Sequence, residues 1–236
     1  MMSDELFQSN APALNVSPHY DDAVFSCGNF LAGRPGSTVI TVFGGVPSDA
    51  ELLTDWDRRC GFDRSCHAMR ERTMENRRAL FALHAKALEF DFLDSQYTGE
   101  ADIDDVQLVD TLFRVVAQLQ SDNVFMPLGL FHGDHIRLSD ALMAICGFFP
   151  DIQWFAYEDI PYRKQVGLVQ ERLSLLYIQG VSMSPVNLQC PATRQKAAAV
   201  SAYRSQLVGL GPGSKPSILR QSEHFWHLSC SVGRRS

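Results

Sequence analysis

The chain has 236 residues, 45% of them hydrophobic and 20% charged, which is the composition of a globular protein with one good core. Its 21 Lys and Arg against 27 Asp and Glu give a net charge of -6, which argues against a nucleic-acid partner. No apolar run approaches the roughly 18 residues that a membrane span needs. The acidic N-terminus does not have the pattern of a signal peptide, so we expect a cytoplasmic protein.

Apolar runs alternate with helical patterns through the first 160 residues. Strands are predicted at 13–18, 37–45, 88–94, 122–129 and 152–159, with helices at 21–33, 68–85, 103–120 and 135–149. Elements that alternate at this spacing predict an α/β fold, with a mostly parallel sheet covered by helices on both faces.

The pattern loosens after Pro161. We predict a strand at 173–180, a helix at 192–207 and a flexible Gly- and Pro-rich loop at 209–217. The sequence has no internal repeat and no convincing linker. The whole chain, 1–236, is therefore predicted to be a single domain whose sheet has a C-terminal extension.

The segment 46–68 is too long and charged for a simple connection, and long loops of this kind often serve as lids or binding loops. Trp56 lies within it and either covers a bound ligand or packs into the core. The six cysteines are scattered without CxxC spacing, so we expect free thiols rather than a disulfide framework or a zinc ribbon.

Two polar clusters follow predicted strands, at the edge where parallel sheets bind their ligands. The first, in "SPHYDD", contains His19, Asp21 and Asp22, and the second, in "HGDH", contains His132 together with Asp134 and His135. In a helix that begins near Asp21, the side chains of His19 and Asp22 can converge on one point.

A divalent cation explains why two adjacent carboxylates stand beside an imidazole, because it offsets their repulsion. Two His and one Asp with an open position for water are the ligands of a catalytic zinc site, although the same set suits iron and other divalent ions. The remaining aspartate could accept a proton from the activated water. Taken alone, Asp21 and Asp22 could equally cap a helix. The second cluster favours the metal site.

Several other activities lack their motifs. The sequence contains no GxGxxG after a strand, no GxxxxGK[ST], no HExxH and no GxSxG. A dinucleotide site, a P-loop and a serine hydrolase of the nucleophile-elbow type are therefore not supported.

Together, "SPHYDDAVFSCG" and "HGDH" resemble the two motifs of the zinc-dependent de-N-acetylases of the LmbE/PIG-L type. The resemblance covers about the first 160 residues and implies a Rossmann-like fold. It implies that His19, Asp22 and His135 bind zinc and that Asp21 is the general base. It also implies that His132 stabilises the oxyanion and can protonate the leaving amine, while Asp134 orients His132.

The same resemblance points to substrate-binding residues. Arg72 matches an arginine that lies near substrate hydroxyls or phosphate. Independently of the resemblance, the residues around Trp56 are a candidate for selectivity. Tyr20 replaces the proline usual in the first motif and could reshape the pocket. Further segments, "YEDIPYR", "KAAAVSAYRSQL" and "EHFW", match one branch of the family and are expected to form pocket walls.

The expected function is therefore zinc-dependent removal of an N-acetyl group from an N-acetylglucosamine-type sugar conjugate, giving acetate and a free amine. The partner would be this small molecule, while the question of a homo-oligomer stays open. Two alternatives remain: another metal-dependent amide or ester hydrolase that uses the same site, and a non-catalytic protein that binds a sugar or a metal.

Overall fold

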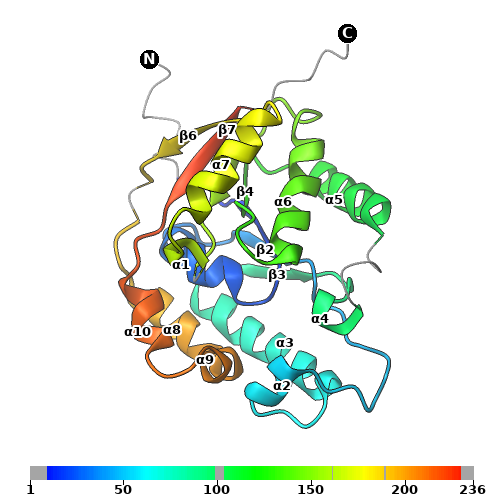
Figure 1. The fold of residues 1–236 in the computed structure, drawn as a ribbon. Coiled ribbons are helices and arrows are strands. Elements are labelled where there is room, and N and C mark those ends of the chain that lie inside the picture. The colour runs from blue at the N-terminus through cyan, green and yellow to red at the C-terminus, as the bar shows by residue number, and fades with distance from the viewer. Residues whose placement is uncertain (1–9, 99–103, 161, 189, 230–236) are drawn as a thin grey trace.

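A seven-stranded mixed sheet organises the protein (Figure 1). The computed structural model describes residues 10–98, 104–160, 162–188 and 190–229. The strands are β1 (Leu14–Ser17), β2 (Thr38–Thr41), β3 (Lys86–Glu89), β4 (Asn123–Pro127), β5 (Gln153–Tyr157), β6 (Ser182–Val186) and β7 (Phe225–Ser229). They lie in the order β3-β2-β1-β4-β5-β7-β6. The first five are parallel, whereas β7 is antiparallel to both β5 and β6.

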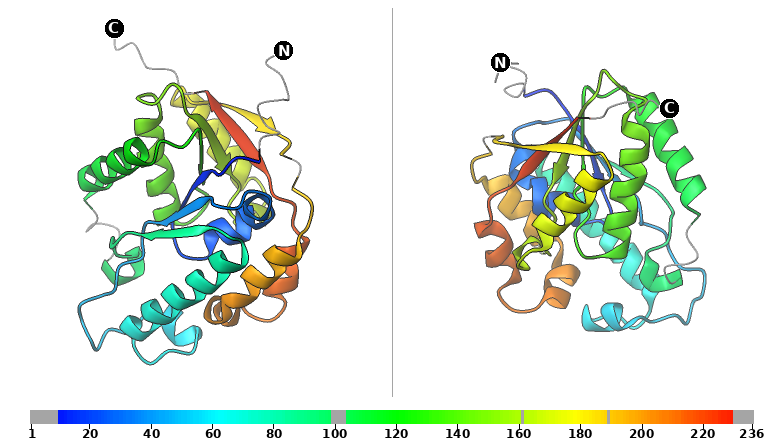
Figure 2. Two further views of the ribbon diagram at one scale, coloured as in Figure 1. Left: turned by 180° about the vertical axis from the view of Figure 1, so that it is seen from behind. Right: turned by 45° about the horizontal axis from the view of Figure 1, so that its top comes forward.

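Helices cover both faces of the sheet (Figures 1 and 2). One face carries α1 (Asp22–Ala32), α3 (Ser65–Ala82), α8 (Arg194–Ala202) and α10 (Ser214–Arg220), and the other carries α5 (Asp105–Leu119), α6 (Gly133–Cys146) and α7 (Leu168–Ile178). Each group of helices shares a hydrophobic core with one face of the sheet. The α/β fold and the C-terminal extension of its sheet are therefore confirmed.

Four short elements lie around these layers. They are α2 (Asp55–Arg59), α4 (Ser95–Thr98), α9 (Arg204–Leu210) and the 3₁₀ turn η2 (Tyr162–Lys164). The first of them, α2, lies inside the long segment 46–68, where Thr54 caps it by accepting a hydrogen bond from the Asp57 N–H.

The strand predicted at 173–180 is wrong, because this segment belongs to helix α7. Its buried residues Val169, Arg172 and Leu176 recur at helical spacing. Val169 and Arg172 lie before the predicted range, and Arg172 is charged, so the apolar run 173–180 did not reveal this spacing. A short apolar run cannot by itself separate a strand from a helix. The extension of the sheet comes from β6 and β7 instead.

Two further predictions for the C-terminal part of the chain differ from the structure. The helix predicted at 192–207 is divided into α8 and α9 at Tyr203, whose φ of -80° and ψ of 61° are not helical. The loop predicted at 209–217 contains the start of α10, which Gly213 precedes in a left-handed conformation.

The cysteines only partly follow the prediction. Cys27, Cys60, Cys66 and Cys190 are free, whereas Cys146 is disulfide-bonded, and Cys230 lies outside the described residues. A pairing between distant cysteines leaves no local spacing pattern from which it could have been predicted. No helix in the described part of the chain is long and apolar enough to cross a bilayer; the cytoplasmic location stays a prediction.

A buried ion pair attaches the C-terminal segments to α1. Lys196 Nζ lies 2.7 Å from Glu223 Oε1, and both side chains are buried. The two oxygens of Glu223 also accept hydrogen bonds from the backbone N–H groups of Asn29 and Phe30. The lysine stem crosses α1 at Gly28, where a Cβ atom would lie 2.8 Å from Lys196 Cγ. Two segments singled out in the sequence, "KAAAVSAYRSQL" and "EHFW", therefore meet on the helix that follows the first motif.

Lys196→Met should lower the free energy of unfolding by about 3–5 kcal/mol, because it leaves the Glu223 carboxylate buried without a cation. Lys215→Met, a change at an exposed lysine of α10, should alter it by less than about 0.5 kcal/mol. Denaturant titration of both variants measures the difference. A cost below about 1 kcal/mol for Lys196→Met would show that the pair does not hold this region together.

Candidate active site

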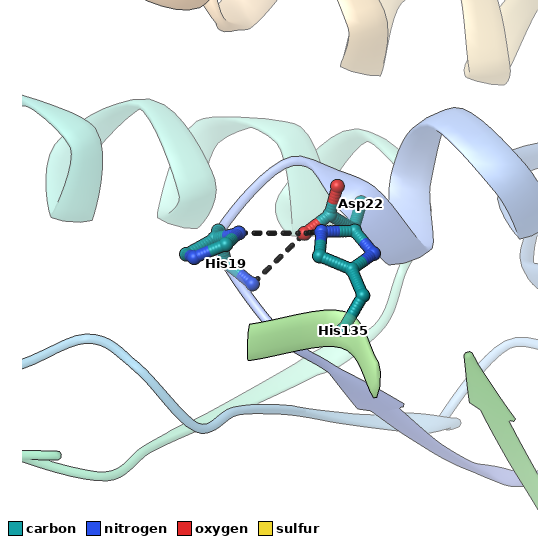
Figure 3. Close-up of side chains that lie close together, drawn as sticks. All are labelled: His19, Asp22 and His135. Atoms are coloured by element: carbon teal, nitrogen blue, oxygen red, sulfur yellow. Dashed lines mark hydrogen bonds and ion pairs between the residues drawn. The ribbon is translucent and has the colours of Figure 1, made fainter. Parts of the chain in front are cut away.

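The two sequence motifs meet at the centre of the sheet. Strands β1 and β4 are neighbours, yet the chain leaves β1 for α1 on one face and leaves β4 for α6 on the other. A crevice opens at such a switch point, outside the carboxyl ends of the strands. It brings His19 and Asp22, at the start of α1, against His135 in the first turn of α6 (Figure 3).

One carboxylate oxygen lies at the middle of this group. Asp22 Oδ2 lies 3.2 Å from His19 Nδ1 and 3.2 Å from His135 Nε2. It also accepts a hydrogen bond of 2.9 Å from the backbone N–H of His19. Asp22 and His135 are buried, and His19 keeps about a fifth of its side chain exposed.

A second carboxylate lies behind each imidazole. His135 Nδ1 is 2.7 Å from Asp159 Oδ1, and His19 Nε2 is 3.1 Å from Asp134 Oδ2. If each outer nitrogen donates its proton to its carboxylate, both inner nitrogens present lone pairs toward Asp22. Carboxylates placed in this way fix the tautomer and orientation of metal-binding histidines.

This donor set fits a cation. Buried His135 Nε2 makes no hydrogen bond, although it faces the Asp22 oxygen. Two acceptors at this distance repel each other unless a proton or a metal ion lies between them. Burial disfavours a charged imidazole, but the Asp22 and Asp159 carboxylates prevail and raise the pKa of His135 to about 9. The surroundings therefore favour positive charge at this point.

Asp21 lies beside the group formed by His19, Asp22 and His135, and lines the same cavity as His19 and Asp22. It is the residue before α1, but its side chain does not cap the helix. Burial and the neighbouring Asp22 carboxylate raise its pKa to about 7. A carboxylate that is not occupied as a cap and titrates near neutrality is suited to accept a proton.

His132 and Asp134 lie together, but not as a hydrogen-bonded pair of side chains. The His132 Nδ1 atom accepts a bond from the backbone N–H of Asp134 and is 3.9 Å from Asp134 Oδ2. That carboxylate oxygen instead contacts His19 and accepts a bond from the Ser95 N–H. The carboxylate of Asp134 therefore orients His19 in this structure. His19, His132 and Asp134 also form a second group close enough to hold an ion.

The loop between β4 and α6 is held by α7 and by the end of β5. Gly129 has a φ of 85°, and a Cβ atom there would lie 2.8 Å from Ser139 Cβ. The N–H groups of Gly129 and Leu130 donate to Asp159 Oδ2, while Arg172 Nε donates to the Leu128 carbonyl. Asp159 thus orients His135 with one oxygen and the loop with the other.

Tyr20 is anchored rather than free. Its ring is 3% exposed, and its hydroxyl lies 3.2 Å from the Gly44 carbonyl and 3.0 Å from Thr73 Oγ1. The backbone carbonyl of Tyr20 accepts a bond from the Tyr203 hydroxyl. The aromatic side chain therefore ties the first motif to Gly44 and to α3, while the backbone at the same position binds Tyr203 at the break between α8 and α9.

Asn76 completes this network from α3. Its Oδ1 atom lies 2.8 Å from the Tyr203 hydroxyl, while its Nδ2 atom has no partner. If the Asn76 amide is rotated by 180°, so that Oδ1 and Nδ2 exchange places, its Nδ2 atom donates to the Tyr203 hydroxyl, and that hydroxyl donates to the Tyr20 carbonyl. Glu75, the residue before Asn76, accepts two bonds from Ser205. These contacts explain why "KAAAVSAYRSQL" accompanies the first motif.

Arg72 reaches the cavity but is already paired. One of its terminal nitrogens lies 2.5 Å from Asp57 Oδ1, and the other donates to the Tyr97 hydroxyl at 3.2 Å. Asp57 is fully buried, so this ion pair fastens the long segment 46–68 to α3. Trp56, next along that segment, lines the cavity and packs against Gly209 of α9. The position of Trp56 in the cavity wall agrees with a role as a ligand cover, and its contact with Gly209 agrees with a role in packing.

The cavity in front of these residues holds about 250 Å³. Its walls combine the polar group with apolar and amide side chains, namely His19, Tyr20, Asp21, Asp22, Phe43, Trp56, Met69, Arg72, Asp94, Gln96, His132, Tyr162, Gln206 and Leu210. His135 lies behind this surface and is fully buried. All three residues predicted to bind the metal and all three predicted to bind substrate are therefore in or against one site.

Sequence reasoning missed several wall residues, among them Asp94 and Tyr162 as well as Phe43, Met69, Gln96 and Leu210. Asp94, whose Oδ2 atom lies 3.5 Å from His19 Nε2, is the last residue of the strand predicted at 88–94, and this position could have indicated it. Tyr162 belongs to "YEDIPYR", a segment expected to form a wall, but no periodicity or spacing separates it from its neighbours.

Comparison with known proteins agrees with this geometry. The family model for GlcNAc-PI de-N-acetylase, PIG-L, matches residues 14–146, which is more than half of the chain. The protein therefore belongs to the PIG-L family of deacetylases. Asp159, Tyr162, Arg172 and Tyr203 all lie beyond the matched residues.

Individual relatives are deacetylases of sugar conjugates. The chain is 28% identical to 2'-N-acetylparomamine deacetylase of Streptomyces fradiae over 207 residues, covering 82% of this chain and 72% of that protein. A deacetylase triple mutant from the teicoplanin biosynthetic pathway has a TM-score of 0.74 at 25% identity, with 94% and 99% of the two chains covered. The zinc-inhibited form of a teicoplanin deacetylase has a TM-score of 0.70 at 23% identity, with the same coverage, and shows the shared fold.

Asp159→Asn should weaken zinc binding about 10- to 100-fold, because it disturbs both His135 and the loop that carries it. Calorimetric zinc titration measures the change. Glu158→Gln is the matched control, since the Glu158 carboxylate contacts Arg163, His224 and Trp226 rather than the histidine group. Equal zinc affinity in the two variants would contradict the role of Asp159.

Proposed function

We propose that this protein is a zinc-dependent N-deacetylase that converts an N-acetylglucosamine-type sugar conjugate into acetate and a free amine. The observation that carries the proposal is the group at Asp22 Oδ2, with two inward imidazole nitrogens and the Asp21 carboxylate beside it. Membership of a deacetylase family supports the reaction class. We further propose that the chain acts as a single catalytic domain.

His19, Asp22 and His135 are the proposed zinc ligands, supported by their mutual distances and by the unpaired His135 Nε2. The teicoplanin deacetylase has a zinc-inhibited form, which concerns that protein and makes zinc a reasonable first choice of ion here. A bound zinc ion would supply a Lewis acid for the acetyl carbonyl and lower the pKa of a bound water to about 7. Other divalent ions suit the same ligands.

The remaining steps belong to residues of the chain. Asp21 accepts a proton from the attacking water as the new C–O bond forms on the acetyl carbon. His132 donates a hydrogen bond to the carbonyl oxygen, which becomes negative, while Asp134 holds His19. When the C–N bond breaks, the proton on Asp21 is available to the leaving nitrogen. Acetate and an amine result, and Asp21 returns to its starting state.

The cavity sets the size of the part of the substrate that enters. A volume of about 250 Å³ lies just below the range of about 300–1,000 Å³ that is usual for small-molecule sites. We propose that one acetylated sugar unit binds inside and that the rest of the conjugate stays outside. Trp56 would then cover the sugar and Tyr20 would shape the floor, while Arg72, whose terminal nitrogens are paired with Asp57 and Tyr97, would hold the segment 46–68 against the sugar.

Acetate release from a panel of N-acetyl sugar conjugates tests the function directly. The panel should contain N-acetylglucosaminides with methyl and phenyl aglycones, 2'-N-acetylparomamine, and matching esters and longer N-acyl analogues. We expect acetate from at least one N-acetyl sugar when zinc is present. Turnover of esters alone would favour the rival hydrolase, and binding without turnover of any substrate would favour the non-catalytic alternative.

Two variants separate the metal from the base. Asp21→Asn should retain zinc and lower kcat about 10²- to 10⁴-fold, because the proton acceptor is lost. His135→Ala should lose both zinc and acetate release. Asp151→Asn and His67→Ala, at exposed positions away from the cavity, are the matched controls. Loss of zinc in Asp21→Asn would make Asp21 a ligand, and full activity in His135→Ala would contradict the metal assignment.

A further inference from the structure

Acceptors outnumber unoccupied donors around the proposed reaction centre. Asp21, Asp22 and Asp94 line the cavity as carboxylates, which cannot donate when ionised. The terminal nitrogens of Arg72 are paired with Asp57 and Tyr97, and its unpartnered Nε atom is buried away from the cavity surface. The Gln96 amide donates to Asp94. Hydrolysis of an amide nevertheless places negative charge on the former carbonyl oxygen, and this charge needs preorganised donors.

Tyr162 is a donor that the mechanism above does not use. Its ring stands edge-on to the ring of His135, with centroids 5.2 Å apart and an interplanar angle of 83°. Its side chain lines the same cavity as Asp21 and His132. Within the described part of the chain, the Tyr162 hydroxyl has no hydrogen-bond partner and is not sealed from solvent.

Phe131 supports the other side of this tyrosine. The two ring centroids are 5.4 Å apart, and Phe131 directly precedes His132. Phe131 has a φ of 64°, a left-handed conformation that a bulky residue rarely adopts, and 59% of it is exposed. Backbone strain of this kind is typical of functional sites. Tyr162 therefore lies between a proposed zinc ligand and the loop of the oxyanion histidine.

Other unpaired donors of the cavity lie farther from this centre. Gln206 belongs to α9 and Trp56 to α2, and Trp56 packs against Gly209. Neither makes a ring or polar contact with His19, Asp22 or His135 among the described residues. Tyr162 is in ring contact with one of the three, which distinguishes it from the outer wall.

We propose that the Tyr162 hydroxyl donates a hydrogen bond to the acyl carbonyl oxygen of the substrate and, together with His132, stabilises that oxygen as it becomes negative. Tyr162 keeps its proton throughout, so the bonds formed and broken remain those of hydrolysis. The inference rests on the proposed deacetylase function and adds a second protein donor to it.

Tyr162→Phe in the zinc-loaded full-length protein is the test, because it removes only the hydroxyl. With phenyl N-acetylglucosaminide as substrate, kcat should fall about 10²-fold while KM changes less than about threefold, since the bond strengthens in the transition state. Zinc content and thermal unfolding should match the wild type. Tyr177→Phe, at a tyrosine of α7 that is 79% exposed, is the control and should retain wild-type kcat.

The outcomes separate this inference from the proposed function. No acetate from the wild-type protein would overturn both. An active wild type with an unchanged kcat in Tyr162→Phe, or with only a raised KM, would overturn the role of Tyr162 alone. Loss of zinc in the variant would also overturn it, because the Tyr162 hydroxyl would then act on the zinc site rather than on the acyl oxygen.

A transition-state analogue gives a second measurement that does not depend on turnover. In a methylphosphonamide of the glucosamine nitrogen, the phosphorus replaces the acyl carbon, and its negative oxygens occupy the positions of the oxygens of the tetrahedral intermediate. Tyr162→Phe should weaken its binding about 10²-fold and leave the binding of the glucosaminide product unchanged. Equal losses for analogue and product would contradict a bond made to the oxyanion.

Discussion

The arrangement of two imidazole nitrogens around one oxygen of Asp22 is the constraint on which the rest of the structure depends. A neutral imidazole presents a lone pair at one nitrogen when its proton is on the other, and the Asp134 and Asp159 carboxylates stabilise that tautomer in His19 and His135. These carboxylates are buried and require donors of their own, which the Ser95 and Gly129 N–H groups supply. The hydrogen bonds that orient the proposed zinc ligands therefore extend to Ser95 at the start of α4 and into the loops that carry Gly129 and Asp159.

The fold satisfies this constraint with both halves of the chain. The family match ends at residue 146, yet Asp159 and Arg172 beyond it fix His135 and its loop. Tyr203 supports the backbone of the first motif from the same region, and the Lys196–Glu223 pair attaches that region to α1. The C-terminal segments therefore position the site as well as enclosing it.

The sequence was sufficient for the features that depend on local pattern. Alternating apolar and helical segments predicted the sheet and most helices up to residue 160, and the two motifs after β1 and β4 predicted the group around Asp22. The sequence was insufficient for features that contacts between distant segments determine. The Leu168–Ile178 helix was mistaken for a strand because its apolar run was short, and the contact of Asp134 with His19 requires knowing how β1 and β4 lie side by side.

Anomalous X-ray diffraction at the zinc edge, from crystals of the protein with one equivalent of zinc, tests the central claim most directly. His19 belongs to two groups of residues that could hold an ion. Asp22 and His135 complete the first group, and His132 and Asp134 complete the second. We expect one peak at about 2.0–2.2 Å from atoms of His19, Asp22 and His135. A peak bound by His132 and Asp134, or none in the cavity, would contradict the proposed zinc site.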